Sequence, residues 1–373
     1  FLMQMDGMDY VTAAKTLADR GGVTLEYDEE QGAGGFRRRL LKLHSEVASK
    51  YHATLKRSPR AKGARAYLAS RDLNAETVDN FMLGFAPDEW SAVLDWGQGK
   101  KYSPDLLVES GLIIKRLKEG AAEPSLYDRF RGRLMFPILD ARGRVVAFSG
   151  LTVDPEAKAA KYINSPETPI FQKGQVLYGL HKARNEIARA REAVICEGQI
   201  DVMRCHQGGF GNAVASLGTA FTEDHATLIK RHADAVTIVF DTDTAGREAA
   251  VKTCRLFLSV GVAAKVAELP EGEDPDSFIR TKGADAFRRA LEAATSSVAF
   301  HVRMLARDED LGSDLGAMRS ARAVLGLIAV SPNAVQKVRL LEEAAELLKL
   351  PLEVLREELR HIARVPAVDD AVA

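Results

Sequence analysis

The sequence predicts an α/β protein in which a parallel sheet flanked by helices lies between a mixed α/β segment and a helical bundle. Three observations support this fold class. Apolar strand-like segments alternate with helix-length segments between residues 193 and 285. Two apolar runs around a turn sequence predict a β-hairpin at 133–150, and residues 286–365 have a helical pattern throughout. At about 100 to 200 residues per domain, the 373 residues are enough for two or three domains.

Four apolar segments predict the strands of the parallel sheet: AVICEG, NAVASLG, AVTIVFD and AAKVAEL, at 193–198, 212–218, 235–241 and 263–269. A helix-length stretch separates each segment from the next. Strands that alternate with helices form parallel sheets, because each crossover helix returns the chain to the same edge.

The segments on either side are predicted from local patterns. Residues 36–83 are mainly helical, with apolar side chains spaced as in Leu40, Leu43 and Val47. The hairpin turns at DARG, residues 140–143. A helix at Tyr10–Arg20, closed by two glycines, precedes a linker rich in glycine and acid. The C-terminal helices are expected to break at Gly312 and near Ser331–Pro332, which predicts a small bundle.

Composition excludes several classes of protein. No apolar run approaches the roughly 18 residues that cross a bilayer, and the first residues lack the pattern of a secretory signal, so we expect a cytoplasmic protein without membrane contact. Three cysteines without CxxC spacing predict neither disulfides nor a zinc site, and they are interpreted as packing residues: Cys196, Cys205 and Cys254.

Charge is unevenly distributed, although the formal net charge is only −1. Eleven lysines and arginines lie between Phe36 and Arg71 against the single acid Glu46. This basic stretch suits a partner with phosphates, but a merely solvated helix surface explains it as well and is favoured. Carboxylates gather later in the chain, around 197–276.

These carboxylates follow the predicted strands. Glu197 ends the first strand, Asp241 and Asp243 follow the third, and Asp274 and Asp276 follow the fourth. The carboxyl ends of parallel strands converge on one crevice, which is where ligands usually bind. Asp201 lies one helical turn after Glu197 and would face the same crevice.

Several carboxylates at one point repel each other unless cations neutralise them. Carboxylate oxygens suit Mg²⁺ or Mn²⁺, and two such ions stabilise the attacking and leaving oxygens of a phosphoryl displacement. The pattern therefore favours phosphoryl or nucleotidyl transfer, with Gly198 and Gly246 admitting the backbone close to the site. The alternative for a single DxD is structural, since aspartate often caps helices and fills turns.

The segment EGQIDVMRCHQGGFGNAVASLGTAFTEDHATLIKRHADAVTIVFDTDTAGREAA, residues 197–250, closely resembles the TOPRIM module in the form found in bacterial DnaG-type primases. Further segments resemble that family's core: YLASRDLNAETVDNFMLGFAPDEW, DRFRGRLMFPILDARGRVVAFSG, KYINSPETPIFQKGQVLYGL and LPEGEDPDSFIRTKG. The likeness covers roughly residues 36–360, and KYINSPET is its most specific element. It implies a TOPRIM-type sheet and the synthesis of short RNA primers on single-stranded DNA.

The resemblance also implies roles for individual residues. Glu197, Asp241 and Asp243 would be catalytic, and with Asp274 and Asp276 they would hold two Mg²⁺ or Mn²⁺ ions that carry the incoming NTP. Lys161 and Lys173 would contact the triphosphate or the nascent strand. The residues implied for binding the DNA template are Arg71, Trp90, Arg129, Arg131 and Asn164.

Structural alternatives remain open for several of these residues. Arg129, Arg131 and Arg133 alternate on a strand-like run and would share a face, which is either a DNA contact or simply solvated. Trp90 would equally serve as a core anchor. The chain also departs from the family pattern at Leu151, where an arginine is usual, and at Thr242, where a glycine is usual.

The resemblance implies a division into segments: 1–35, the tail of an upstream zinc-binding module and a linker; 36–185, an N-terminal α/β subdomain; 186–285, the TOPRIM domain; 286–365, a helical bundle; and 366–373, a tail. The zinc-binding module and the helicase-binding module of the family are not found, so we expect a fragment of a larger primase. The implied partners are single-stranded DNA, NTPs and, through the missing module, the replicative helicase, and the core is expected to be monomeric.

Two other functions stay open. A TOPRIM nuclease or topoisomerase would share the acidic crevice, although no segment here predicts the separate domain with a nucleophilic tyrosine that a topoisomerase needs. A noncatalytic primase-like protein that binds DNA is the second alternative, and Leu151 favours it.

Overall fold

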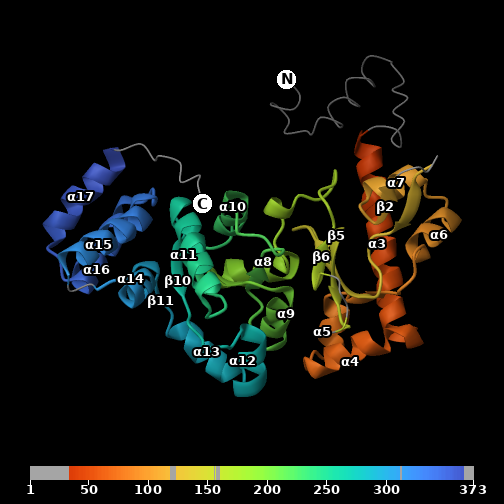
Figure 1. Cartoon of the computed structure of the whole chain (residues 1–373), viewed down its shortest axis with the longest axis horizontal. Coiled ribbons are helices and arrows are strands. Elements are labelled where there is room, and N and C mark those ends of the chain that lie inside the picture. Colours follow the sequence, from red (N-terminus) through yellow and green to blue (C-terminus); the bar gives the residue numbers. More distant parts are fainter. Residues whose placement is uncertain (1–32, 118–122, 155, 157–159, 311–312, 365–373) are drawn as a thin grey trace, which may run out of the picture.

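The computed structural model describes residues 33–117, 123–154, 156, 160–310 and 313–364. The predicted helix Tyr10–Arg20, most of the predicted linker, Gly312 and the predicted tail lie outside these residues. Figure 1 shows the first subdomain on one side, the central sheet with its helices in the middle and the helical bundle on the other side.

The first subdomain is built on a four-stranded antiparallel sheet of order β1-β4-β5-β6. Its strands are β1 (Gly84–Ala86), β4 (Arg133–Leu139), β5 (Val145–Thr152) and β6 (Tyr162–Asn164). β4 and β5 form the predicted hairpin, whose turn contains Gly143 at φ +79°. The KYIN segment supplies β6, so Lys161 and Asn164 lie at the edge of this sheet.

Helices cover this sheet, as predicted for residues 36–83. Helix α3 (Ala33–Arg57) packs Leu43, Val47 and Tyr51 into the core, where the Tyr51 ring meets Phe148 of β5 edge to face. The other helices of the subdomain are η1 (Pro59–Ala61), α4 (Lys62–Ser70), α5 (Ala75–Asn80), α6 (Ala92–Gly99) and α7 (Pro104–Glu109).

The segment around Arg129–Arg133 differs from the prediction. A small hairpin of β2 (Ile113–Arg116) and β3 (Ser125–Asp128) ends before Arg129, and β4 begins only at Arg133. Gly132, at φ +59°, interrupts the extended backbone between them. The prediction that three alternating arginines share one face of a strand is therefore wrong.

The central sheet has the order β11-β10-β9-β7-β8, and β7 to β10 are parallel as predicted. Its strands are β7 (Glu192–Cys196), β8 (Ala213–Ala215), β9 (Ala235–Val239), β10 (Ala263–Val266) and the antiparallel edge strand β11 (Thr295–Ser296). The sequence pattern did not predict β11, which is two residues long.

Alternation along the strands sends side chains to two separate cores. Ile195 and Ile238 pack with α8 (Leu180–Ala190), α10 (Glu223–Lys230) and α11 (Thr244–Ser259). Val194 and Val239 face the opposite core, which contains α9 (Gln199–Gln207), α12 (Pro275–Lys282) and α13 (Ala284–Glu292). That second core is continuous with the core of the first subdomain, so the two parts are packed against each other.

The remaining helices form the predicted bundle: α14 (Ser297–Asp308), α15 (Asp314–Ala329), α16 (Ala334–Leu348) and α17 (Leu352–Arg364). They share an apolar core that includes Val324, Ile328 and Leu341, and the chain breaks at Ser331–Pro332 as predicted. A short helix η2 (Lys173–Gln175) precedes α8. Within the described residues, no helix has the length and apolar character needed to cross a bilayer.

All three cysteines are buried and free, which confirms the prediction that they are packing residues. The sulfur atoms of Cys196 and Cys205 lie 3.9 Å apart between β7 and α9.

Candidate active site

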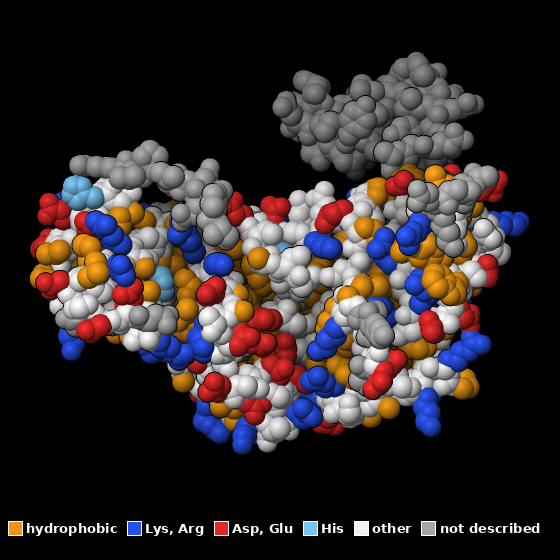
Figure 2. Space-filling view, in the orientation of Figure 1, with side chains coloured by type: hydrophobic (Ala, Val, Ile, Leu, Met, Phe, Trp, Pro, Cys, Tyr) orange, Lys and Arg blue, Asp and Glu red, His pale blue; other side chains and the backbone are white. Residues whose placement is uncertain are grey.

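A pocket of about 340 Å³ lies between the central sheet and the first subdomain, at the carboxyl ends of β7, β8 and β9. One wall carries Glu197, Asp201, Asp241 and Asp274. The other wall comes from α4, β5 and β6, and its side chains are Tyr67, Arg71, Ser149, Lys161, Tyr162 and Asn164. Figure 2 shows acidic side chains gathered in the middle of this face, with basic side chains next to them toward the first subdomain.

The Glu197 side chain bonds to the backbone of Asp241. The Asp241 amide donates to Glu197 Oε1 over 2.9 Å, which brings the ends of β7 and β9 together. Partial burial raises the pKa of Glu197, and repulsion from Asp241 and Asp243 raises it further. Burial also raises the pKa of Asp241, with added repulsion from Asp274 and Asp243. Carboxylates that repel each other in this way would gain stability from a bound cation.

Asp243 begins helix α11. Its Oδ1 accepts a hydrogen bond from the Gly246 amide over 2.7 Å, so the side chain is an N-cap. A Cβ at position 246 would collide with the Asp241 carbonyl oxygen and lie 3.1 Å from Glu197 Oε1, so only glycine fits here. Asp243 and Asp274 line an adjoining hollow of about 490 Å³ with Thr242, Arg247 and the 271–274 loop.

Asp274 is likewise an N-cap, because its Oδ1 accepts from the Ser277 amide of α12 over 2.6 Å. Its side chain borders both hollows. The capping alternative raised from the sequence is therefore true of Asp243 and Asp274, but both also face the acidic pocket or its extension. Capping leaves further carboxylate lone pairs available to a ligand.

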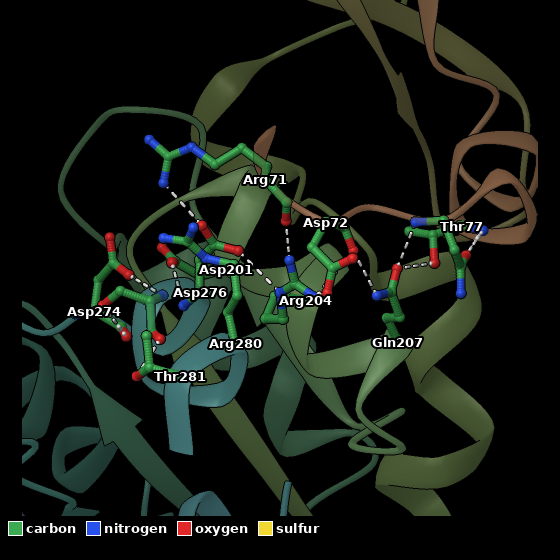
Figure 3. Close-up of polar contacts among 12 residues, drawn as sticks. Arg71, Asp72, Thr77, Asp201, Arg204, Gln207, Asp274, Asp276, Arg280 and Thr281 are labelled. Carbon is green, nitrogen blue, oxygen red and sulfur yellow. Dashed lines mark hydrogen bonds and ion pairs between the residues drawn. The ribbon is translucent and has the colours of Figure 1, made fainter. Parts of the chain in front are cut away.

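Asp276 does not join the other carboxylates in the pocket. It is 1% exposed, and its two oxygens accept hydrogen bonds from different arginines. Arg71 donates to Oδ2 over 2.8 Å and Arg204 donates to Oδ1 over 2.9 Å (Figure 3). The structure thus places this predicted metal ligand in a buried ion pair outside the pocket, with each oxygen facing an arginine.

Asp201 is a buried acid between these groups. Its Oδ2 accepts from the Gly198 amide over 3.1 Å and its Oδ1 from the Asp276 amide over 3.3 Å. Burial, together with repulsion from Asp274 and Asp241, raises its pKa well above the usual value, although the bond from the Asp276 amide opposes the shift. Through these two hydrogen bonds Asp201 connects the start of α9 to the start of α12.

The opposite wall carries two basic side chains and one amide side chain. Lys161 is exposed at the pocket, and Arg71 reaches it from the end of α4 with its guanidinium 5.5 Å from the Tyr67 ring. Asn164 Nδ2 donates to the Leu217 carbonyl over 2.7 Å, whereas its Oδ1 is buried without a hydrogen-bond partner. Lys173 lies outside the pocket on η2, and its backbone bonds to Glu167 and His225.

Trp90 is 66% exposed, so the alternative that it anchors the core is wrong. The Arg131 guanidinium lies 4.1 Å from its ring centroid, and Tyr127 packs against the ring edge to face. An exposed aromatic ring beside a cation is suited to stacking on a base next to a phosphate.

The neighbouring arginines point elsewhere. Arg129 Nε donates to the Gly111 carbonyl over 2.8 Å. Arg133 is only 6% exposed and holds the carbonyls of Gly150, Ala160 and Lys161. Arg133 thus fixes the start of β6 and, with it, the backbone of Lys161.

The two departures from the family pattern have structural explanations. Leu151 is buried in β5 between Leu134 and Tyr162 of the neighbouring strands. Thr242 does not have a positive φ, and its Oγ1 accepts from the Gly272 amide over 3.1 Å. The threonine therefore connects the loop after β9 to the loop before α12.

A divalent cation fits the chemistry of the acidic wall. Among the residues that the structure describes, no three His, Cys, Asp or Glu side chains are grouped closely enough to hold a metal ion by themselves. Magnesium is often held by one or two carboxylates, with waters and substrate phosphates completing its shell. Glu197, Asp241, Asp243 and Asp274 satisfy that requirement.

Comparison with known sequence families gives two matches. Residues 50–184 match the family described as the N-terminal domain of the DNA primase catalytic core, and residues 194–279 match the Toprim-like family. A DNA primase of Halalkalibacterium halodurans is 34% identical over 98% of this chain and 60% of its own length. One from Clostridium acetobutylicum is 37% identical over 81% of this chain and 49% of its own length. The chain therefore spans less than two thirds of these curated relatives.

Comparison with solved structures also gives primase domains. A DnaG primase catalytic domain bound to ssDNA is 36% identical, with a TM-score of 0.74 over 84% of this chain and 97% of that chain. A DNA primase domain from Pseudomonas aeruginosa is 35% identical, with a TM-score of 0.76 over 86% of this chain and 100% of that chain. Sequence, fold and the acidic strand ends lead to one assignment: the chain belongs to the DnaG-type primase family, whose catalytic core it contains.

Proposed function

We propose that this chain is a DNA-dependent RNA polymerase core, a nucleotidyltransferase that joins NTPs into short RNA primers on single-stranded DNA. One observation carries the proposal: a single pocket has carboxylates from three strand ends on one wall and Lys161, Arg71 and Asn164 on the other. Such a pocket suits an anionic substrate, which would contact the basic wall directly and bind the carboxylate wall through metal cations.

Glu197, Asp241, Asp243 and Asp274 would hold Mg²⁺ or Mn²⁺, with two ions expected from the chemistry of nucleotidyl transfer. When bound, these ions would supply positive charge to the oxygens that gain charge as the α-phosphate is transferred. Asp276 would act indirectly, because it is buried outside the pocket and pairs with Arg71 and Arg204.

The chain's own residues would orient the reactants. Lys161 would attract the triphosphate at the pocket, and Arg71, fixed by Asp276, would present a positive charge opposite the carboxylates. The free Oδ1 of Asn164 would accept a hydrogen bond from a nucleotide. Lys173 lies farther along the same segment, where it would meet the nascent strand or the end of the triphosphate.

The template would run past Trp90 and Arg131, with the tryptophan stacking on a base and the arginine contacting a phosphate. Arg129 would act through its bond to Gly111, which shapes the same surface. A replicative helicase as partner, a monomeric core, a cytoplasmic location and the predicted domain boundaries remain predictions.

The test is incorporation of labelled NTPs on single-stranded DNA with Mg²⁺ or Mn²⁺. Asp241→Asn keeps the size of the side chain and removes its charge, so short RNA products should fall by at least about a hundredfold if the carboxylate acts on the transition state. Asp285→Asn, at an exposed acid in the first turn of α13, is the matched control and should retain activity. Primer synthesis that survives Asp241→Asn would contradict the proposal.

A further inference from the structure

Arg204 is a buried arginine that the sequence patterns did not single out. It lies on α9, three residues after Asp201, so these two positions are on the same side of the helix. Its side chain is 3% exposed. A buried arginine is costly unless its donors are satisfied, so its partners should explain its presence.

The guanidinium of Arg204 bonds to both sides of the domain junction (Figure 3). Nε donates to Asp276 Oδ1 on α12 over 2.9 Å. Nη1 donates to the carbonyl of Asp72 over 3.2 Å, and Nη2 donates to the carbonyl of Arg71. Two of its acceptors thus belong to the first subdomain and one to the Toprim domain.

These contacts close a ring of three residues. Arg204 holds the backbone carbonyl of Arg71 and one oxygen of Asp276, while the Arg71 side chain donates to the other oxygen of Asp276 over 2.8 Å. Arg71 is therefore fixed at its backbone and at its guanidinium by the same pair of partners. Because Arg71 lines the pocket opposite Glu197 and Asp241, the ring determines where its charge lies.

Gln207, one turn further along α9, binds the adjacent turn. Its Nε2 donates to the Asp72 carbonyl over 2.9 Å, and its Oε1 accepts from the Asn74 amide over 3.0 Å and from Thr77 Oγ1 over 2.9 Å. The helix that begins next to Glu197 therefore holds the whole 71–77 turn. A fixed distance between the two walls would be needed to align reacting groups, since a displacement of about 1 Å can cost about a hundredfold in rate.

We propose that Arg204 is a positioning residue, which through Asp276 and the 71–77 turn sets the placement of Arg71 across the pocket from the carboxylate wall. The inference rests on the proposed function in assigning Arg71 to the pocket chemistry. The geometric part, that Arg204 orders the 71–77 turn, does not depend on that function.

The test compares Arg204→Met with Arg191→Met. Arg191 pairs with Asp234 on the surface at the start of β7, away from the pocket, so its variant controls for loss of an arginine in the same domain. Hydrogen exchange at 71–77 should accelerate by about tenfold or more in Arg204→Met and stay unchanged in Arg191→Met. The kcat for primer synthesis should fall by about ten- to a hundredfold in the first variant only.

Two further variants separate positioning from a general loss of structure. Arg204→Lys keeps the charge, but its three N–H donors are all on one nitrogen and cannot reach the three separate acceptors as the guanidinium does. This variant should therefore restore part of the kcat, and it provides the test if Arg204→Met does not fold. In an Arg71→Met background, Arg204→Met should lower kcat by no more than about twofold further, because the residue it positions is gone.

Unchanged exchange at 71–77 in Arg204→Met would overturn the proposal, as would faster exchange with wild-type kcat, which would leave Arg204 a merely structural role. If the decreases in kcat of the two single variants multiply in the double variant, Arg204 does not act by positioning Arg71. A wild-type chain that makes no primers would instead count against the proposed function, while the exchange result would still decide whether Arg204 orders the turn.

Discussion

His44 lies on the inner face of α3, fully buried, with its ring stacked on Phe148 at a centroid distance of 5.7 Å. Its Nδ1 is 2.8 Å from the Leu40 carbonyl, so the ring must carry its proton on that nitrogen. Burial lowers the pKa of His44 to about 4, despite the opposing effect of that hydrogen bond. The residue is thus neutral in the folded protein across the physiological range.

This shift predicts a pH-dependent loss of stability. An unfolded histidine binds a proton near pH 6.5, whereas folded His44 does so only near pH 4. The free energy of unfolding is therefore unaffected by this residue above about pH 6.5 and falls by about 3 kcal/mol as the pH falls toward 4 and below. His44→Phe keeps the ring and removes the titration. The difference in unfolding free energy between wild type and variant, measured with urea at pH 7, 5.5 and 4.5, should shift in favour of the variant as the pH falls.

The comparison cancels titrations common to both proteins, including that of Asp128, whose pKa burial raises to about 6. His361→Phe, at an exposed position on α17, is the control and should follow the wild type at every pH. A difference for His44→Phe that is constant with pH would show that burial does not suppress protonation of this ring.

At the scale of elements, two helices of the Toprim domain begin at residues that also face the acidic pocket or its extension. Asp243 caps α11 through the Gly246 amide, and Asp274 caps α12 through the Ser277 amide. A cap needs only a side-chain oxygen, whereas the proposed metal binding needs a negative charge. Substitutions can therefore separate the two roles.

Asp243→Ala should lower the free energy of unfolding by about 1 kcal/mol, because it leaves the Gly246 amide without its acceptor. Asp243→Asn retains the acceptor and should change stability by less. Both variants should lose primer synthesis, as measured by NTP incorporation beside chemical denaturation. Asn333→Ala, which removes the cap of α16, is the control for cap loss with activity retained. If Asp243→Asn is active, this aspartate serves only as a helix cap.

Local patterns predicted the elements well where one periodicity dominates. The β4–β5 hairpin and the four parallel strands follow from short continuous apolar runs, and the C-terminal helices follow from apolar residues with a period of 3.6. The failures are short or irregular. β11 has two residues, and the bend at Gly132 separates arginines that a period of 2 would have placed together.

At the scale of the whole molecule, the pocket exists because the first subdomain and the central sheet share one apolar core. Figure 1 shows β6 and α4 beside the helices that follow the parallel strands. Trp90 and Arg131 lie together at the surface of the first subdomain, where single-stranded DNA would approach.

Trp90→Ala should weaken binding of single-stranded DNA by about 1 to 3 kcal/mol, because a base would lose its stacking partner. Fluorescence anisotropy at one fixed salt concentration measures the change, since affinity for DNA depends on salt. Val335→Ala, at a 72% exposed apolar residue of the helical bundle, is the control for loss of a surface side chain. Equal affinities for the Trp90 variant and the wild type would place the template elsewhere.

The sequence alone determined the fold class, the order of the main elements and the acidic strand ends. These depend on local periodicity and on the rule that parallel strands end at one edge, which is enough to group Glu197, Asp241 and Asp274 at a single crevice. The KYIN and FQKG lysines were found by resemblance, and their roles remain predictions.

Only the tertiary structure decided which acids face the pocket and which are neutralised beneath it. Asp276 follows the same strand as Asp274, yet it is buried between Arg71, from a segment 205 residues earlier in the chain, and Arg204. Asp201 lies on the pocket wall but is 8% exposed, and burial together with repulsion from Asp274 and Asp241 raises its pKa. Burial and ion pairing depend on long-range packing, because the partner that desolvates or neutralises a charge comes from a distant part of the chain, and no local pattern records it.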